Sequence, residues 1–249
     1  MKRQAQKMMM NKYLLDYLED STKRNRIQQK EFSLNEGINL YIKDPLTREV
    51  DVREVMSKIH TTIPPHLMLE IDSIFVGIFD DFEEMDTNAM FKDGAIYVSN
   101  EQDNEEDMID DIVHEIAHSL ESPHGYIIYG DRKLHNEFLS KRKKLYDILE
   151  AEDLAPNKKL FMDTEYSKEL DMYLYEDVGY DRLNFIASSY SLFTSAYCAT
   201  SLREYFANGF EYYFLDNREY LKDICPRLYD KIKELHEYDY NELNGLNYD

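Results

Sequence analysis

Two histidines and a glutamate near the middle of the chain have the spacing of a metal-binding helix. His114 and His118 are four positions apart, which places their imidazoles one above the other on the same side of an α-helix. Neutral imidazoles bind Zn²⁺ at about 2.0–2.1 Å, and the intervening Glu115 can reach a water held by the metal. This HExxH pattern predicts a site with one Zn²⁺ per chain, in which Glu115 is the general base for hydrolysis of a peptide bond.

The helix that carries this motif, expected at about residues 105–121, has an apolar side that would anchor it in a core. Its apolar residues fall on one arc of the helical wheel, and the histidines lie outside this arc. The arc consists of Met108, Ile109, Ile112, Val113, Ile116 and Leu120. Asp111, one turn before His114, also lies outside it and is a candidate to orient that imidazole. An ordinary surface pair of histidines is the alternative interpretation.

A catalytic zinc usually has a third protein ligand, and two residues compete for this role. His124 stands ten residues after His114, which is the spacing of the metzincins, but Glu121 occupies the position of their turning glycine. Glu204, on a second predicted helix, would face the histidines as the third ligand does in the gluzincins. Ser201 and Glu204 also form a capping-box pattern, in which Glu204 bonds the backbone at the helix start, and this alternative remains open.

A tyrosine upstream of Glu204 adds a family resemblance. Tyr197 precedes Glu204 by seven residues, and this pair downstream of HExxH resembles the catalytic domain of anthrax lethal factor and the bacterial Pro-Pro endopeptidases. The strand-like residues 94–100 are similar to the edge strand above the clefts of these enzymes, so the resemblance covers about residues 65–215 in patches. It implies that Glu204 completes the zinc site and that the Tyr197 hydroxyl stabilises the oxyanion of the tetrahedral intermediate. Tyr197 as one more buried aromatic among 21 tyrosines is the alternative.

One position departs from the gluzincin pattern. Many gluzincins carry a carboxylate four residues after the ligand glutamate, where it orients a zinc-bound histidine. Here that position is Asn208. Its side-chain carbonyl could accept an imidazole N–H, but only as a neutral and weaker partner, which affects turnover more than metal binding.

The remaining patterns predict an α+β, zincin-like architecture. Residues 72–79 and 94–100 are rich in β-branched and aromatic residues and predict strands of a small mixed sheet, the second of them as the edge strand over the cleft. The second half of the chain is largely helical in pattern. We expect a charged helical arm at residues 1–35 and one metallopeptidase domain at residues 36–249, with a helical elaboration at about residues 125–190.

Composition limits the partners. The chain has 29 Lys and Arg against 50 Asp and Glu, a net charge of −21 that repels phosphate, so we expect no nucleic-acid or membrane partner. Neither a signal peptide nor a run of 18 apolar residues is recognisable, which predicts a cytoplasmic protein, with unmarked export or incorporation into an assembly as alternatives. Cys198 and Cys225 lack the spacing of a metal or redox pair and are expected to be buried free thiols in a reducing compartment.

These features predict a zinc-dependent endopeptidase that acts on a peptide or protein substrate. The acidic residues 101–107, if they lie near the cleft mouth, predict a preference for basic or neutral peptides. The alternative from another class is a catalytically inactive zincin-like scaffold or a binding subunit of an assembly, which docks a protein partner through its N-terminal helix. A second enzymatic alternative is a metal-dependent hydrolase of a non-peptide amide. Peptide deformylases share HExxH but take an upstream cysteine ligand, whereas both cysteines here lie downstream, which disfavours this alternative.

Overall fold

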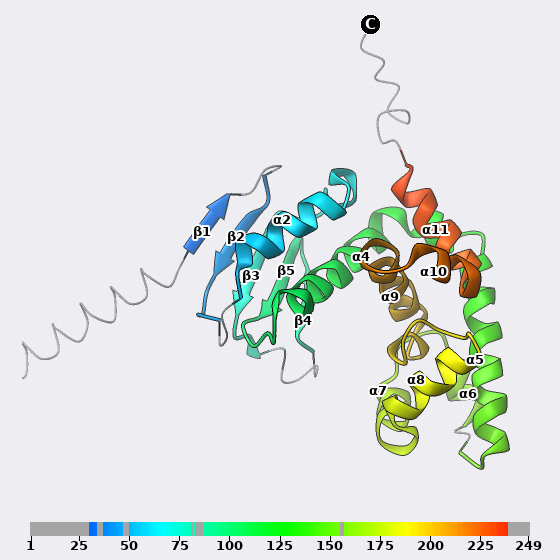
Figure 1. Ribbon diagram of the computed structural model, residues 1–249. Coiled ribbons are helices and arrows are strands. Elements are labelled where there is room, and N and C mark those ends of the chain that lie inside the picture. Colours follow the sequence, from blue (N-terminus) through cyan, green and yellow to red (C-terminus); the bar gives the residue numbers. More distant parts are fainter. Residues whose placement is uncertain are drawn as a thin grey trace, which may run out of the picture. The chain divides into compact units, whose positions relative to one another are not determined.

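The computed structural model describes residues 30–33, 37–46, 50–80, 82, 87–154 and 157–238, and within them the chain is α+β, as predicted (Figure 1). The chain divides into two compact units, which we call the sheet unit and the helical unit. The sheet unit comprises Met1–Val50 and Ile71–Asn104, and the helical unit comprises Asp51–Glu70 and Glu105–Asp249. The single domain expected at residues 36–249 is therefore divided between two units.

The sheet unit contains a mixed five-stranded sheet. Its strands are β1 (Lys30–Ser33), β2 (Asn39–Ile42), β3 (Ser73–Gly77), β4 (Ala89–Lys92) and β5 (Ala95–Ser99), in the order β1-β2-β3-β5-β4. The three central strands are parallel, and the two outer pairs are antiparallel. On one face, the rings of Tyr41, Phe75 and Tyr97 stack across the parallel strands with centroid distances of 5.0 and 5.3 Å.

The strand expected at the edge of the sheet is an internal strand, so this prediction is wrong. β5 lies between β3 and β4, and β4 forms the edge instead. The cause is the turn at Asp93 and Gly94, whose φ values of 51° and 80° are both positive. A two-residue turn of this kind folds one strand directly back onto the next, so β4 covers the edge that β5 would otherwise expose.

The helical unit contains all the predicted site residues. Its helices are α2 (Val52–Thr62), α4 (Glu105–Tyr129), α5 (Lys133–Ala151), α6 (Lys158–Phe161), α7 (Lys168–Met172), α8 (Tyr180–Ser189), α9 (Leu202–Leu215), α10 (Arg218–Ile224) and α11 (Pro226–His236). Short 3-10 turns at Pro65–Leu67 (η2) and Tyr197–Ala199 (η4) and a π-helical turn at Tyr173–Val178 (η3) complete it. Residues 125–190 are largely helical.

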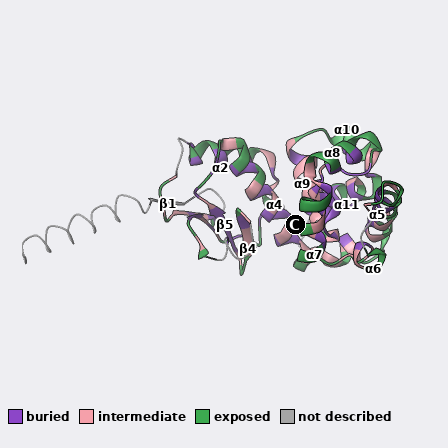
Figure 2. Cartoon of the chain, turned by 90° about the horizontal axis from the view of Figure 1, so that it is seen from below, coloured by how far each residue is buried: buried purple, intermediate pink, exposed green. Residues whose placement is uncertain are grey.

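α4 is the predicted motif helix, and its apolar arc is buried as expected. All six residues of that arc are 7% exposed or less, and Figure 2 marks the buried residues of the unit. α4 packs against α2 and along α9, and α9 in turn packs against α11. Gly209 permits the close approach of α11, because a Cβ atom at this position would collide with the side chain of Leu228.

Other expectations meet the structure only in part. The helical arm at residues 1–35 lies mostly outside the described residues, and its described part, Lys30–Ser33, is strand β1. Cys198 and Cys225 are buried free thiols, as predicted. Among the described helices, none combines the length and the apolar character needed to cross a bilayer.

A buried arginine fixes the entry to α9. Arg142 on α5 is 0% exposed, and its guanidinium donates hydrogen bonds to four backbone carbonyls. The carbonyls of Ala199 and Thr200 accept at 2.7 Å each, and those of Phe161 and Asp163 are the other two acceptors. Burial lowers the pKa of Arg142 to about 10, so the group is still charged at neutral pH. Its charge is compensated chiefly by carbonyl dipoles.

We predict that Arg142→Met lowers the free energy of unfolding by about 3 kcal/mol or more. The substitution leaves four buried carbonyls without a donor, and each unpaired buried group costs about 1–3 kcal/mol. Urea denaturation measures the change. Arg182→Met is the matched control, because its exposed ion pair with Glu152 is worth about 1 kcal/mol or less. Equal losses in the two variants would contradict this role of Arg142.

Candidate metal centre

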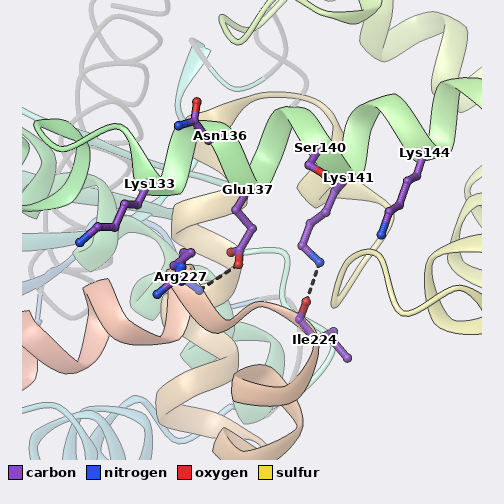
Figure 3. Close-up of a pocket in the computed structure, with 8 residues that line it drawn as sticks. All are labelled: Lys133, Asn136, Glu137, Ser140, Lys141, Lys144, Ile224 and Arg227. Atoms are coloured by element: carbon purple, nitrogen blue, oxygen red, sulfur yellow. Dashed lines mark hydrogen bonds between the residues drawn. The ribbon is translucent and has the colours of Figure 1, made fainter.

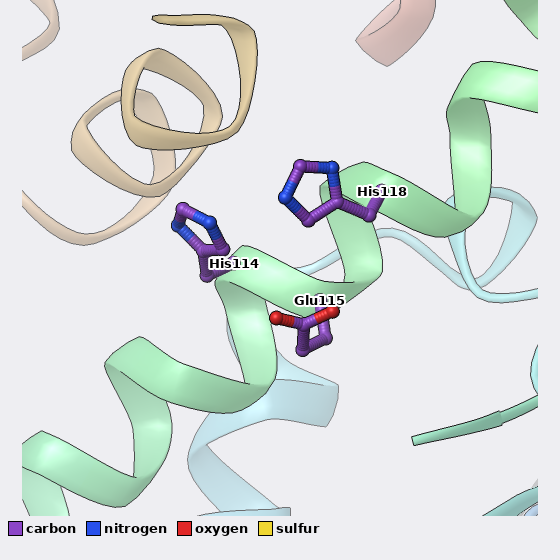
Figure 4. Close-up of side chains that lie close together, drawn as sticks. All are labelled: His114, Glu115 and His118. Atoms are coloured by element: carbon purple, nitrogen blue, oxygen red, sulfur yellow. The ribbon is translucent and has the colours of Figure 1, made fainter. Parts of the chain in front are cut away.

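The two histidines of the motif project from the same side of α4, as Figure 4 shows. Their ring centroids lie 4.9 Å apart, and their side chains are 17% and 12% exposed. Glu115 projects from a different side of the helix and is buried, at 7% exposed. Ligand atoms of His114, Glu115 and His118 nevertheless lie within 4.8 Å of one another. These three side chains are therefore close enough together to hold a metal ion.

Glu204 on α9 contacts both imidazoles. Its Oε2 lies 3.0 Å from His114 Nε2, and its Oε1 lies 3.6 Å from His118 Nε2. Two donors bound to one tetrahedral zinc are separated by about 3.3 Å, as follows from zinc–ligand distances of about 2.0–2.1 Å. The two observed separations, which involve different carboxylate oxygens, lie on either side of that value, so each imidazole has a carboxylate oxygen at about the spacing of two zinc ligands.

The structure shows only one half of the capping box at the start of α9. Ser201 is the N-cap, and its Oγ accepts the backbone N–H of Glu204 at 3.1 Å. The carboxylate of Glu204 is directed to the histidines instead of completing the box. Backbone capping and the histidine contact therefore use different atoms of Glu204 and are compatible.

His124 lies away from the histidine pair. α4 continues without a break past Glu121 to Tyr129, so the turn that would return His124 towards the metal is absent there. Six helical residues after His118 correspond to a rotation of about 240°, which puts His124 on another side of the helix. Its ring packs against Tyr238 with a centroid distance of 5.7 Å. The structure thus places Glu204, and not His124, beside the pair.

Each histidine also has a carboxylate at its second ring nitrogen. His118 Nδ1 donates to Glu121 Oε1 at 2.6 Å, and Glu121 Oε2 accepts from Arg203 Nε at 2.6 Å. His114 Nδ1 lies 3.4 Å from Glu211 Oε2. Such partners fix the ring orientation and leave Nε2 as the atom that faces a metal. Sequence reasoning missed both roles, although Glu211 follows Glu204 by seven residues and so shares its side of α9.

The expectation for Asn208 as an imidazole partner is wrong. Its Nδ2 donates to the carbonyl of Glu204 at 3.0 Å, and its Oδ1 accepts from the Ser195 hydroxyl at 2.8 Å. The Asn208 side chain, one helical turn after Glu204, is thus bonded to its own helix and to the segment before η4. The carboxylate near His114 Nδ1 is that of Glu211 instead.

The carboxylates around His114 and His118 strongly favour the protonated, positively charged form of the two imidazoles. Burial would lower the pKa of His114 and His118, but hydrogen bonds to Glu204, Glu211 and Glu121 outweigh it and raise the two values to about 10 and about 9. Burial would likewise raise the pKa of Glu204, but the two histidines hold it below its usual range. Two protonated imidazoles carry a charge of +2, and two neutral imidazoles with one Zn²⁺ carry the same charge. Carboxylates that stabilise the first arrangement therefore also suit the second.

Tyr197 on η4 lies at the border of the centre. Its ring centroid is 6.5 Å from that of His114. Burial first, and then the charges of Glu204 and Asp171, raise its pKa above the usual value, so its hydroxyl stays protonated. Among the described residues, no hydrogen-bond partner of this hydroxyl is found. The pKa of a second tyrosine, Tyr180, is also raised, first by burial and to a smaller extent by the charges of Asp171 and Glu204. Its hydroxyl, however, donates a hydrogen bond to Asp171 at 2.8 Å.

The site is thus assembled from three segments of the helical unit: α4, η4 and α9. The structure brings together His114, Glu115, His118 and Glu204, and it places Tyr197 nearby. No protein-family model, curated protein or solved structure shows significant similarity to the chain.

We predict that Glu121→Gln and Glu211→Gln each weaken Zn²⁺ binding by about 10–100-fold, because each removes a charged partner of a ligand imidazole. The larger effect is expected for Glu121, whose contact with its histidine is 2.6 Å long, against 3.4 Å for Glu211. Competition with a chromogenic chelator measures the affinity.

Glu219→Gln on α10 is the control for these two variants, since this exposed side chain lies outside the site. Unchanged affinity in both test variants would show that the two carboxylates do not support the histidines.

Proposed function

We propose that the helical unit binds one Zn²⁺ through His114, His118 and Glu204 and hydrolyses peptide bonds. The observation that carries this proposal is the position of the Glu204 carboxylate, 3.0 and 3.6 Å from the two Nε2 atoms. Two imidazoles and one carboxylate form a donor set used by catalytic zinc, which keeps a fourth position open. When bound, Zn²⁺ would polarise the peptide carbonyl and acidify a water molecule.

Glu115 is the proposed general base. It lies between the two ligand histidines in sequence, and its carboxylate stays within 4.8 Å of their ligand atoms. A carboxylate there accepts a proton from the attacking water and later delivers it to the leaving amine.

Tyr197 is the proposed donor to the oxyanion. Attack on a peptide carbonyl places negative charge on oxygen, and a neutral hydroxyl stabilises that charge by donating a hydrogen bond. The raised pKa of Tyr197 keeps its proton in place, and its hydroxyl is not committed to another described residue. Tyr180 is less suited to this role because its hydroxyl is bound to Asp171.

The arrangement supports a gluzincin, zincin-like enzyme resembling the catalytic domain of lethal factor and the Pro-Pro endopeptidases. The support lies in the source of the ligands: two histidines from one helix and a glutamate from a second helix, with a tyrosine seven residues before it. The direct partner of this chain would be a peptide or protein substrate.

A non-catalytic scaffold is the second candidate, and one observation favours it. With pKa values of about 10 and about 9, His114 and His118 are protonated at neutral pH when no metal is bound. Their contacts with Glu204 then join α4 to α9 without an ion. In that case the cluster would be a buried ion-pair network, and neither zinc nor hydrolysis would be found.

We predict that Glu115→Gln lowers the rate of peptide hydrolysis by about 10²–10⁴-fold while zinc content stays at the wild-type level. The variant keeps the shape of the side chain but cannot accept the proton. Cleavage of a mixed peptide library, followed by mass spectrometry, measures activity.

Glu106→Gln, an exposed change on the same helix, is the matched control and is expected to cleave as the wild type does. A zinc-loaded wild type that cleaves no peptide, or a Glu115→Gln variant as active as Glu106→Gln, would contradict the proposal.

A further inference from the structure

A groove of about 480 Å³ runs along one side of α5 towards the start of α11 (Figure 3). It lies in the helical unit but is separate from the metal centre. Tyr205 reaches it, donating from its hydroxyl to Glu137 at 2.9 Å, whereas the preceding residue, Glu204, faces α4. Successive residues of a helix point about 100° apart, so the groove and the metal centre adjoin different sides of α9.

The groove is positively charged in a chain whose net charge is −21. Four cationic side chains line it, Lys133, Lys141, Lys144 and Arg227, with one acidic residue, Glu137. Both carboxylate oxygens of Glu137 already accept hydrogen bonds. Its carboxylate accepts the Tyr205 hydroxyl and the backbone N–H groups of Arg227 and Leu228 at 2.9–3.1 Å. Glu137 thus caps the start of α11 and is not paired with the lysines.

Two of the four cations have no carboxylate partner within the described part of the chain. Lys133 pairs with Asp131 at 3.1 Å, and Arg227 pairs with Asp230 at 3.3 Å. Lys141, only 7% exposed, donates instead to the carbonyls of Leu192 and Ile224, at 2.6 Å each. An ammonium has three N–H donors, so a third remains besides these two carbonyls, with the ring of Phe193 6.0 Å from the nitrogen. Lys144 is exposed and forms no ion pair with a described residue.

We propose that this groove binds an acidic segment of a partner protein, which lies along α5 with its carboxylates at Lys141 and Lys144. An anion supplied from outside would compensate a nearly buried charge that has no carboxylate partner among the described residues. The side of α5 from Lys133 to Lys144 is about 16 Å long, which matches about five extended residues and exceeds a single small anion. Nucleic acid is disfavoured because the whole chain repels a long polyanion.

Fluorescence anisotropy with a labelled peptide of alternating Glu and Ser tests the proposal on the full chain. The wild type is expected to bind it, and to bind it more weakly as salt increases. Lys144→Glu is expected to weaken binding by about 10-fold or more, since an attraction becomes a repulsion. Because Lys144 is exposed, this variant should fold. Lys58→Glu, an exposed change on α2, gives the same change in net charge and should leave binding unaltered.

Four results would overturn the proposal. The first is no binding of the acidic peptide by the wild type, and the second is equal binding by wild type and Lys144→Glu. The third is full displacement of the peptide by millimolar inorganic phosphate, which would indicate a small-anion site. The fourth is equally tight binding of a single-stranded oligonucleotide of the same charge, which would indicate recognition of phosphate backbones.

Discussion

The carboxylate of Glu204 contacts the imidazoles of His114 and His118 on another helix, and the surrounding structure must hold these three groups together. His114 and Glu204 are 90 residues apart in sequence, so α4 and α9 must pack side by side for the contact to form. Charged groups this deeply placed are costly unless each is paired. The outer carboxylates Glu121 and Glu211 and the cation Arg203 supply those pairings. The same network suits two protons or one divalent cation, so the proposed metal binding would depend on pH, because protons would compete with the metal for both histidines.

The entry to α9 is fixed by Arg142 on α5. Its guanidinium binds the carbonyls of Ala199 and Thr200, which lie between Tyr197 and Glu204 in sequence. Ser201 then caps the helix, and the backbone N–H of Leu202 donates to the carbonyl of Thr164 at 2.9 Å. A short segment with this many fixed backbone groups has little freedom to move. The backbone between Tyr197 and Glu204 is therefore held by buried hydrogen bonds, as the proposed active site would require.

The parts of the account that sequence could supply are those with a local signal. The spacing of His114 and His118 and the apolar arc of α4 follow from helical periodicity, and both were predicted correctly. Glu211 and Arg142 were missed because their roles depend on which helices pack together. Glu121 was missed although it lies three residues after His118 on the same helix, which is a local signal. Asn208 was misjudged because a side chain one turn along a helix bonds its own backbone as readily as a distant imidazole. The position of β5 was misjudged because the Asp93-Gly94 turn adds a strand that has little apolar periodicity of its own.

The most direct test of the central claim is the zinc content of the purified protein, measured by elemental analysis beside Glu204→Ala and His124→Ala. The account predicts about one zinc per chain in the wild type and in His124→Ala, and a loss of zinc in Glu204→Ala, because Glu204, unlike His124, contacts both His114 and His118. A wild type that remains free of zinc after reconstitution, or a Glu204→Ala variant that retains a full equivalent, would contradict it.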